Sequence, residues 1–155
     1  ADGHDGHPGN AQSPRITPHH LFHFCGSGRA AVFCDALDRA SVFEALYARR
    51  CYATTGPPIL LDVSVNGHAM GERIPPTGNG VRRVLQVRCE GTTGIDHVRI
   101  VRNGRVVHTA PCHGAFSAEL EWGDPAPAEQ SDPASYYVRI VQVDGESAWS
   151  TPIWT

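Results

Sequence analysis

The sequence contains no lysine, and all 13 of its basic residues are arginine. Without lysine the chain cannot form a Schiff base through a side chain of its own or supply the lysine of a phosphate-binding P-loop, so both chemistries are excluded. Asp and Glu number 16, which gives a formal net charge of −3. This mildly acidic balance lacks the basic footprint of a protein that binds nucleic acid or an anionic membrane surface.

Long apolar runs and paired cysteine motifs are also missing. No stretch approaches the ~20 apolar residues that span a bilayer, so we expect no membrane partner. The five cysteines lack CxxC spacing, which argues against a disulfide framework or a structural zinc site, although a Cys89–Cys112 bridge stays open. Unpaired thiols favour a reducing compartment, so we expect a cytoplasmic location.

The first residues hold two carboxylate–imidazole pairs, Asp2-Gly3-His4 and Asp5-Gly6-His7. In extended backbone an Asp-x-His spacing places both side chains on one face, and this donor pair suits Zn, Mn or Fe. Two ligands are too few for a metal site of three or four ligands, so on composition alone a polar tail is the alternative reading. We therefore expect further ligands to lie outside this chain.

A strand–helix–strand pattern follows. Residues 30–34 and 59–65 are short apolar runs typical of buried strands, and Asp38 is a good N-cap for a helix between them. An apolar stripe runs along that helix, formed by Val42, Phe43, Leu46 and Tyr47. This order resembles the last unit of an α/β domain.

The remainder of the chain has the pattern of antiparallel β-structure. Asn66-Gly67, Asn103-Gly104 and Asp144-Gly145 are hairpin turn signals. Six strand candidates lie among them: residues 83–89, 95–102, 105–110, 116–122, 136–143 and 148–154. We expect an α+β, mainly β protein with two units: residues 1–72 as a short α/β remnant of a barrel, and residues 73–155 as an immunoglobulin-like antiparallel β-sandwich.

Two sets of residues each allow both a functional and a structural interpretation. In Tyr52-Ala53-Thr54-Thr55-Gly56, the hydroxyls, the backbone amides and the nearby Arg50 could bind an anionic substrate, or the threonines could satisfy backbone groups as the helix ends. The three tryptophans are more typical of sandwich core anchors than of a sugar-stacking platform.

Four stretches together resemble the C-terminal part of a bacterial family related to the PHP (polymerase and histidinol phosphatase) metal-dependent phosphoesterases. They are DGHDGHPGN (2–10), LFHFCGSGRAAVF (21–33), ALYARRCYATTGPPILLDVSVNGHAMG (45–71) and YYVRIVQVDGESAWSTPIW (136–154). Within them, residues 49–56 and 148–154 are the most specific.

The resemblance implies a distorted (β/α)₇ barrel whose last ligand motif is Asp-x-His. It makes Asp2 and His4 ligands of a divalent metal cluster of Zn, Mn or Fe, and it leaves His7 at most a second-shell or substrate contact. It also favours the interpretation that Arg50, Tyr52, Thr54 and Thr55 bind the substrate. The opening His-x-His and the intermediate Glu and His ligands of the family are absent from this sequence.

We therefore interpret the chain as a C-terminal fragment of a metal-dependent hydrolase, inactive by itself, whose partner is the missing N-terminal part of the same protein. The alternative is a non-catalytic β-sandwich module that binds an unknown ligand. If the helix exposes a face that the barrel covers, its apolar stripe (residues 42–47) predicts a homodimer instead.

Overall fold

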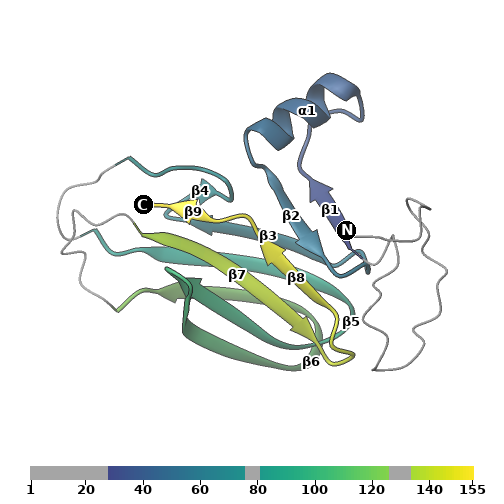
Figure 1. Ribbon diagram of the computed structural model, residues 1–155. Coiled ribbons are helices and arrows are strands. Elements are labelled where there is room, and N and C mark those ends of the chain that lie inside the picture. Colours follow the sequence, from purple (N-terminus) through teal and green to yellow (C-terminus); the bar gives the residue numbers. More distant parts are fainter. Residues whose placement is uncertain (1–27, 76–80, 126–133) are drawn as a thin grey trace.

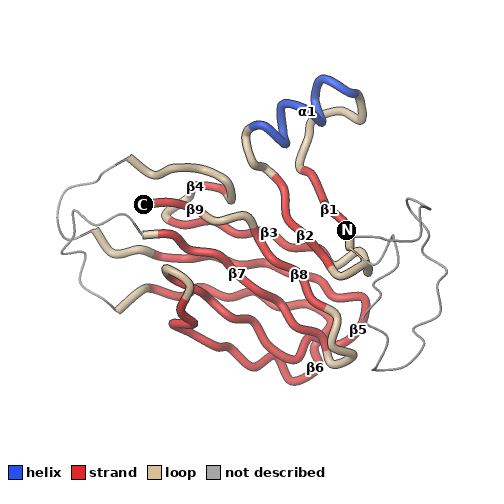
Figure 2. The backbone as a smooth tube through the Cα atoms, in the orientation of Figure 1, coloured by secondary structure: helices blue, strands red, loops and turns tan. Residues whose placement is uncertain are grey.

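The computed structural model describes residues 28–75, 81–125 and 134–155. In these ranges the chain forms one antiparallel sheet of nine strands and one short helix (Figures 1 and 2). The prediction of a mainly β protein is confirmed.

The first elements in the described ranges are β1 (Arg29–Val32), α1 (Arg39–Tyr47), β2 (Cys51–Thr54), β3 (Leu60–Val65) and β4 (His68–Ala69). The remaining strands are β5 (Val84–Arg102), β6 (Arg105–Gly123), β7 (Ser135–Gln142), β8 (Ser147–Ser150) and β9 (Ile153–Trp154).

The long strand β5 holds the sheet together. Its first half pairs with β3, its second half pairs with β7, and β6 follows it along both halves. The strand order is β1-β2-β8-β7-β5-β3-β4, with β6 on β5 and β9 on β7. Because the two halves of β5 have different neighbours, the sheet curls round on itself instead of remaining an open layer, as Figure 1 shows.

The curl occurs where β5 and β6 change register, between Glu90 and Ile95. Two glycines make this bend sterically feasible. A Cβ on Gly91 would lie 2.4 Å from the Thr93 carbonyl oxygen, and one on Gly94 would lie 2.6 Å from the Gly114 carbonyl oxygen. The backbone approaches itself too closely there for any side chain, which is a common reason for glycine inside a strand.

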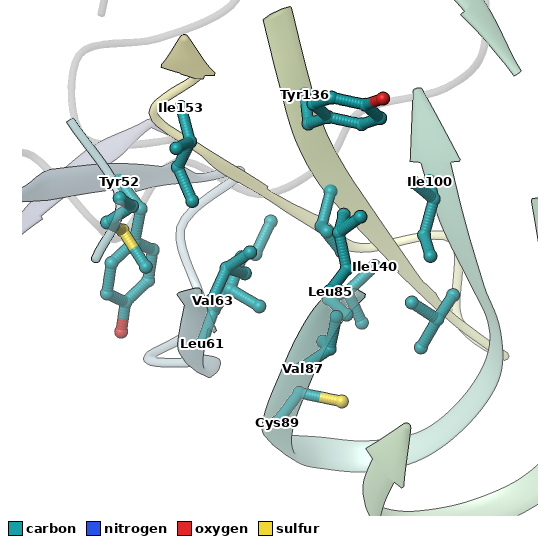
Figure 3. Close-up of a cluster of buried hydrophobic side chains, with 14 of the residues drawn as sticks. Tyr52, Leu61, Val63, Leu85, Val87, Cys89, Ile100, Tyr136, Ile140 and Ile153 are labelled. Carbon is teal, nitrogen blue, oxygen red and sulfur yellow. The ribbon is translucent and has the colours of Figure 1, made fainter. Parts of the chain in front are cut away.

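The core fills the inside of this curl (Figure 3). Every second residue of β5 and β7 points inward, so that Val98, Ile100, Val138 and Ile140 are each no more than 1% exposed. These alternating apolar residues form the inner face of the sheet. β3 contributes Leu61, Val63 and Val65 to this cluster, and Tyr52, Leu85 and Ile153 also belong to it.

The three predicted hairpin turns are present. Asn66-Gly67 joins β3 to β4 and Asn103-Gly104 joins β5 to β6; both asparagines and both glycines have positive φ angles, as a type I′ turn requires. Asp144-Gly145 joins β7 to β8, with a positive φ at the glycine alone.

Several strand boundaries differ from the prediction. Residues 83–89 and 95–102 belong to one strand, β5, and residues 105–110 and 116–122 to another, β6, because the glycines between them bend a strand without ending it. Conversely, residues 148–154 divide into β8 and β9 around Pro152. Strand β2, directly after the helix, was not predicted.

The β1–α1–β2 segment differs from an α/β barrel unit. β1 and β2 pair antiparallel, whereas successive strands of a βαβ unit run parallel. The sheet is also continuous across the predicted boundary at residues 72 and 73: β2 pairs with β8 and β3 pairs with β5. Strands from the two predicted units thus share one sheet and one core.

Helix α1 begins as predicted at Asp38. The Asp38 carboxylate accepts bonds from the Ser41 amide and the Ser41 hydroxyl, each at 2.9 Å, and these bonds lower the pKa of Asp38. The apolar stripe of this helix is largely exposed. Phe43 is 67% exposed and Tyr47 81% exposed, and only Ala45 is buried.

Candidate functional site

The predicted metal ligands Asp2 and His4, together with His7, lie outside the described residues. Within the three described ranges, no group of three or more His, Cys, Asp or Glu side chains is placed to hold a metal ion. The predictions for Asp2, His4 and His7 therefore remain predictions.

Tyr52 is a core residue with a defined hydrogen bond. It lies on β2, is 7% exposed, and donates its hydroxyl to the Ile59 carbonyl oxygen at 2.9 Å. Its ring contacts that of Phe33 with centroids 5.7 Å apart, and burial raises the pKa of the phenol. The hydroxyl thus holds the loop before β3 against β2, and it does not face solvent.

Thr54 and Thr55 are engaged in local contacts at the end of β2. The Thr54 hydroxyl accepts a bond from the Gly56 amide at 3.2 Å. The Thr55 hydroxyl donates to the Glu146 carboxylate and accepts from the Ser147 amide at 2.9 Å. These contacts join the β2 end to β8 and match the structural alternative, in which the threonines satisfy nearby groups.

Arg50 lies at the other end of β2. Its carbonyl accepts from the Phe33 amide at 2.9 Å and its own amide donates to the Ala45 carbonyl at 2.9 Å, while its side chain is exposed. Four strand residues separate it from Thr55, which corresponds to a rise of roughly 16 Å. The structure therefore brings Thr54 and Thr55 together and leaves Arg50 at a distance.

Arg49, Arg73 and Trp154 form an arginine–tryptophan surface that the sequence did not predict. The guanidinium carbons of Arg49 and Arg73 each lie 5.6 Å from the centre of the Trp154 ring. The Arg49 Nε also donates to the Gly71 carbonyl at 2.9 Å. Two cations on one ring concentrate positive charge, and guanidinium groups bind carboxylate or phosphate well. No local motif signals this surface, because its members come from segments far apart in the sequence.

All three tryptophans are half-buried, whereas core positions were expected for them. Trp122 stacks on His108 with centroids 5.5 Å apart, and the Arg139 guanidinium lies 5.2 Å from the centre of Trp149. Each ring thus has a polar partner, and Trp122 also packs against the core.

Asp124 is a buried carboxylate, 5% exposed, at the end of β6. It accepts bonds from Arg102 at 2.6 Å and from the Tyr136 hydroxyl at 2.7 Å. Burial and, after it, the hydrogen bond to Asp124 raise the pKa of Tyr136 to about 12. These three groups link β5, β6 and β7 at one end of the curl, and their mutual bonds indicate a structural role.

A second polar cluster surrounds the β7–β8 turn. Gln142, 1% exposed, accepts bonds from the Thr92 amide at 2.7 Å and the Thr93 amide at 3.3 Å. The Asp144 carboxylate accepts from the Glu146 amide at 3.0 Å. The cluster therefore satisfies the backbone of the β5 bend and of the turn itself.

The cysteines that could have formed a bridge are both free. Cys89 and Cys112 carry thiols, and burial raises the pKa of the Cys89 thiol to about 11. Both face the core rather than solvent, so neither is an activated nucleophile.

Among proteins of known sequence, the chain is similar to three chlamydial proteins described only as uncharacterised. It is 36% identical to a Chlamydia pneumoniae protein over 139 residues, which cover 82% of this chain and 22% of that protein. Proteins of Chlamydia muridarum and Chlamydia trachomatis are 37% and 36% identical over the same length. The chain spans about a fifth of the length of these relatives.

No family model and no solved structure matches the chain. None of the helices in the described ranges is long and apolar enough to cross a membrane.

Proposed function

We propose that this chain is one part of a longer, cytoplasmic metal-dependent hydrolase of the PHP phosphoesterase class, to which it contributes two metal ligands and a supporting β-sheet. The observation that carries the proposal is an Asp-x-His pair in a chain that spans 22% of its relatives. A hydrolytic site needs at least three protein ligands, and the rest of a protein of that length has room for the others.

The donor set fits the metal that this class uses. Asp2 and His4 supply one carboxylate oxygen and one imidazole nitrogen, a combination that suits Zn, Mn or Fe. The bound metal would polarise the scissile ester and lower the pKa of water at neutral pH. In this proposal the chain supplies two of the metal ligands, and His7 and Arg50 are candidate substrate contacts.

The sheet fits an immunoglobulin-like sandwich. The two halves of β5 pair with different strands, β3 on one half and β7 on the other, which supports a two-layer arrangement. Alternate residues of these strands form the core, as they do in a sandwich. Such a unit supports a catalytic domain without providing catalytic groups.

A non-catalytic binding module is the second candidate, and the arginine–tryptophan surface favours it. Arg49 and Arg73 on Trp154, with Arg50 nearby, offer exposed guanidinium groups to an acidic ligand. Under this alternative the ligand would bind to the isolated 155-residue chain, and charge-reversing changes at Arg73 would abolish binding.

The test compares the full-length protein with its Asp2→Ala and His4→Ala variants, using metal content and hydrolysis of a generic phosphodiester. Loss of a residue that hydrogen-bonds to a metal ligand costs roughly 10- to 100-fold in activity. We expect each of these two variants, which removes a ligand itself, to lose more activity than that. Asp5→Ala is the matched control from the same segment and should retain both metal and activity. Undiminished hydrolysis by both ligand variants, or turnover by the 155-residue chain alone, would refute the proposal.

A further inference from the structure

The outward surface of α1 is an unusual concentration of exposed apolar side chains. Phe43 is 67% exposed, Leu46 46% and Tyr47 81%, and Leu37 just before the helix is 97% exposed. The rings of Phe43 and Tyr47 stack with centroids 6.4 Å apart and planes 17° apart. We call these four residues the α1 face.

The large apolar side chains of α1 face away from the protein, whereas those of an ordinary surface helix face its core. A helix turns about 100° per residue, so Ala45 lies on nearly the opposite side from Phe43. Ala45 is completely buried and is the only buried residue of α1. The helix thus turns a small side chain toward β1 and its large apolar ones toward solvent, whereas a helix that covers its own core does the opposite.

This small contact is too little to hold a short helix. α1 has nine residues, and isolated helices below roughly 12–15 residues are marginal in water, because most helical stability comes from packing of the apolar face. Figure 1 shows α1 projecting from the sheet beyond the ends of β1 and β2. The helix therefore requires a covering surface that the described residues do not provide.

The neighbouring strand extends the same surface. β1 ends the strand order of the sheet and pairs with β2 alone among the described strands. Phe33, which follows β1, is 43% exposed. An unpaired strand edge next to an apolar helix face is the kind of surface that a further domain covers.

We propose that the α1 face is an internal domain interface, covered by an apolar groove in the part of the full-length protein that lies outside this chain. The proposal rests on the proposed function only in requiring that longer protein, and it does not depend on metal chemistry. In the chlamydial relatives the matched region is 22% of the protein, so most of the polypeptide lies elsewhere and is covalently tethered to this region.

The size of the surface favours a tethered partner over a second copy. A stable interface between separate chains buries about 800 Å² on each partner, and a nine-residue helix is only about 14 Å long. A tethered domain needs less area because its effective concentration is high. The stacked Phe43–Tyr47 pair would be the central anchor, as buried aromatic residues commonly are at interfaces.

Site-specific photo-crosslinking in the full-length protein tests the proposal. Benzoylphenylalanine placed at Tyr47 should crosslink to a peptide outside residues 1–155 of the same polypeptide, with no increase in mass. The control position is Val106, which is 55% exposed on β6 and should give no such peptide. A crosslink to a second copy, a crosslink within residues 1–155, or no crosslink would each overturn the proposal.

A stability comparison provides an independent readout. Phe43→Ser should leave the Tm of the 155-residue chain unchanged, since this ring is exposed there, and should lower the temperature at which this region unfolds in the full-length protein. Equal Tm changes in both proteins would contradict a domain interface. Because Asp2→Ala should not alter the Tyr47 crosslink, failure of the hydrolase proposal and failure of this one are distinguishable.

Discussion

Asp124 and Tyr136 show how a buried carboxylate can be fixed by groups that titrate far from neutral pH. The carboxylate accepts bonds from Arg102 and from the Tyr136 hydroxyl, and the phenol must keep its proton to donate. Its pKa of about 12 compares with about 10 for an unfolded tyrosine. The folded state therefore holds this proton more tightly than the unfolded state does.

A pH-dependent loss of stability follows from this difference. The pKa of Tyr136 is higher in the folded state than in the unfolded state. The stability that the protonated phenol contributes is therefore fully present below pH ~10 and is lost as the pH rises toward about 12. We expect the free energy of unfolding, measured in urea, to fall between these values in the native sequence and to fall less in Tyr136→Phe.

Tyr136→Phe should also lower the free energy of unfolding by about 1–2 kcal/mol at pH 8, because it removes a hydrogen bond to a buried charged group. Tyr137→Phe, at the next position on β7, is the matched control and should retain the full alkaline loss. An unchanged pH profile in Tyr136→Phe would show that other groups cause that loss.

Side-chain environments were the least predictable feature from sequence. Residues 123–134 have the composition of a surface loop, yet Asp124 is buried because Arg102 and Tyr136 reach it from other strands. Thr55 was open to two readings, and its bonds to Glu146 and Ser147 depend on β8, which lies far along the chain. Such partners lie far away in the sequence and cannot be predicted from the neighbouring residues.

At the scale of elements, turns were easier to predict than strand ends. Asn-Gly pairs favour the positive φ angles of a type I′ turn, and they therefore predict a hairpin. Gly91, Gly94 and Gly114 also look like turn residues, but there the strands pair on both sides of the bend and the hydrogen-bonded ladder continues. A glycine that ends a strand and one that bends it cannot be distinguished without the partner strand.

The bend predicts a specific sensitivity to substitution. Gly94→Ala would place a Cβ 2.6 Å from the Gly114 carbonyl oxygen, a backbone atom that cannot move freely, and we expect a loss of about 2–3 kcal/mol in urea unfolding. At Gly123 the clash is with the end of the flexible Arg82 side chain, so Gly123→Ala should cost much less. Equal losses would mean that the bend has room to relax.

Helix α1 shows the limit of pattern analysis for a single element. Its cap and apolar stripe were evident from Asp38 and from Phe43 and Tyr47, and the helix forms as expected. The direction in which that stripe points depends on the surface that covers it, which the periodicity of the helix does not specify.

For the whole molecule, the continuity of the sheet across residues 72 and 73 bears on how the chain folds. Leu61, Val63 and Val65 of β3 are at most 2% exposed and pack in the same core as β5 and β7. Burial of each such side chain is worth about 1.5–3 kcal/mol, and whole domains are stable by only about 5–15 kcal/mol.

Residues 73–155 expressed alone should therefore lose cooperative thermal unfolding, as followed by circular dichroism. Supplying residues 28–72 as a separate peptide should restore part of the transition, because it returns β2 and β3 to their neighbours β8 and β5. A sharp transition in residues 73–155 without that peptide would support two independent units with the predicted boundary.

The functional prediction rests on a different part of the chain from the fold. The β-rich architecture follows from alternation and turn residues within the described ranges, whereas Asp2 and His4 lie outside them. A metal site assembled from several regions of a long protein has only some of its ligands in any one segment, so the pair Asp2 and His4 stays a prediction.

The interrupted geometry of β6 has a consequence for the behaviour of the protein at high concentration. Among the described strands, this 19-residue strand pairs only with β5, and a long unpaired edge is a template on which strands of other molecules can add to form fibrils. Pro111 has no amide hydrogen to offer, and His113 and Gly114 have φ angles of 52° and 80°, far from extended backbone. The template is thereby divided into two short pieces, which protects the molecule against fibril growth along its longest strand.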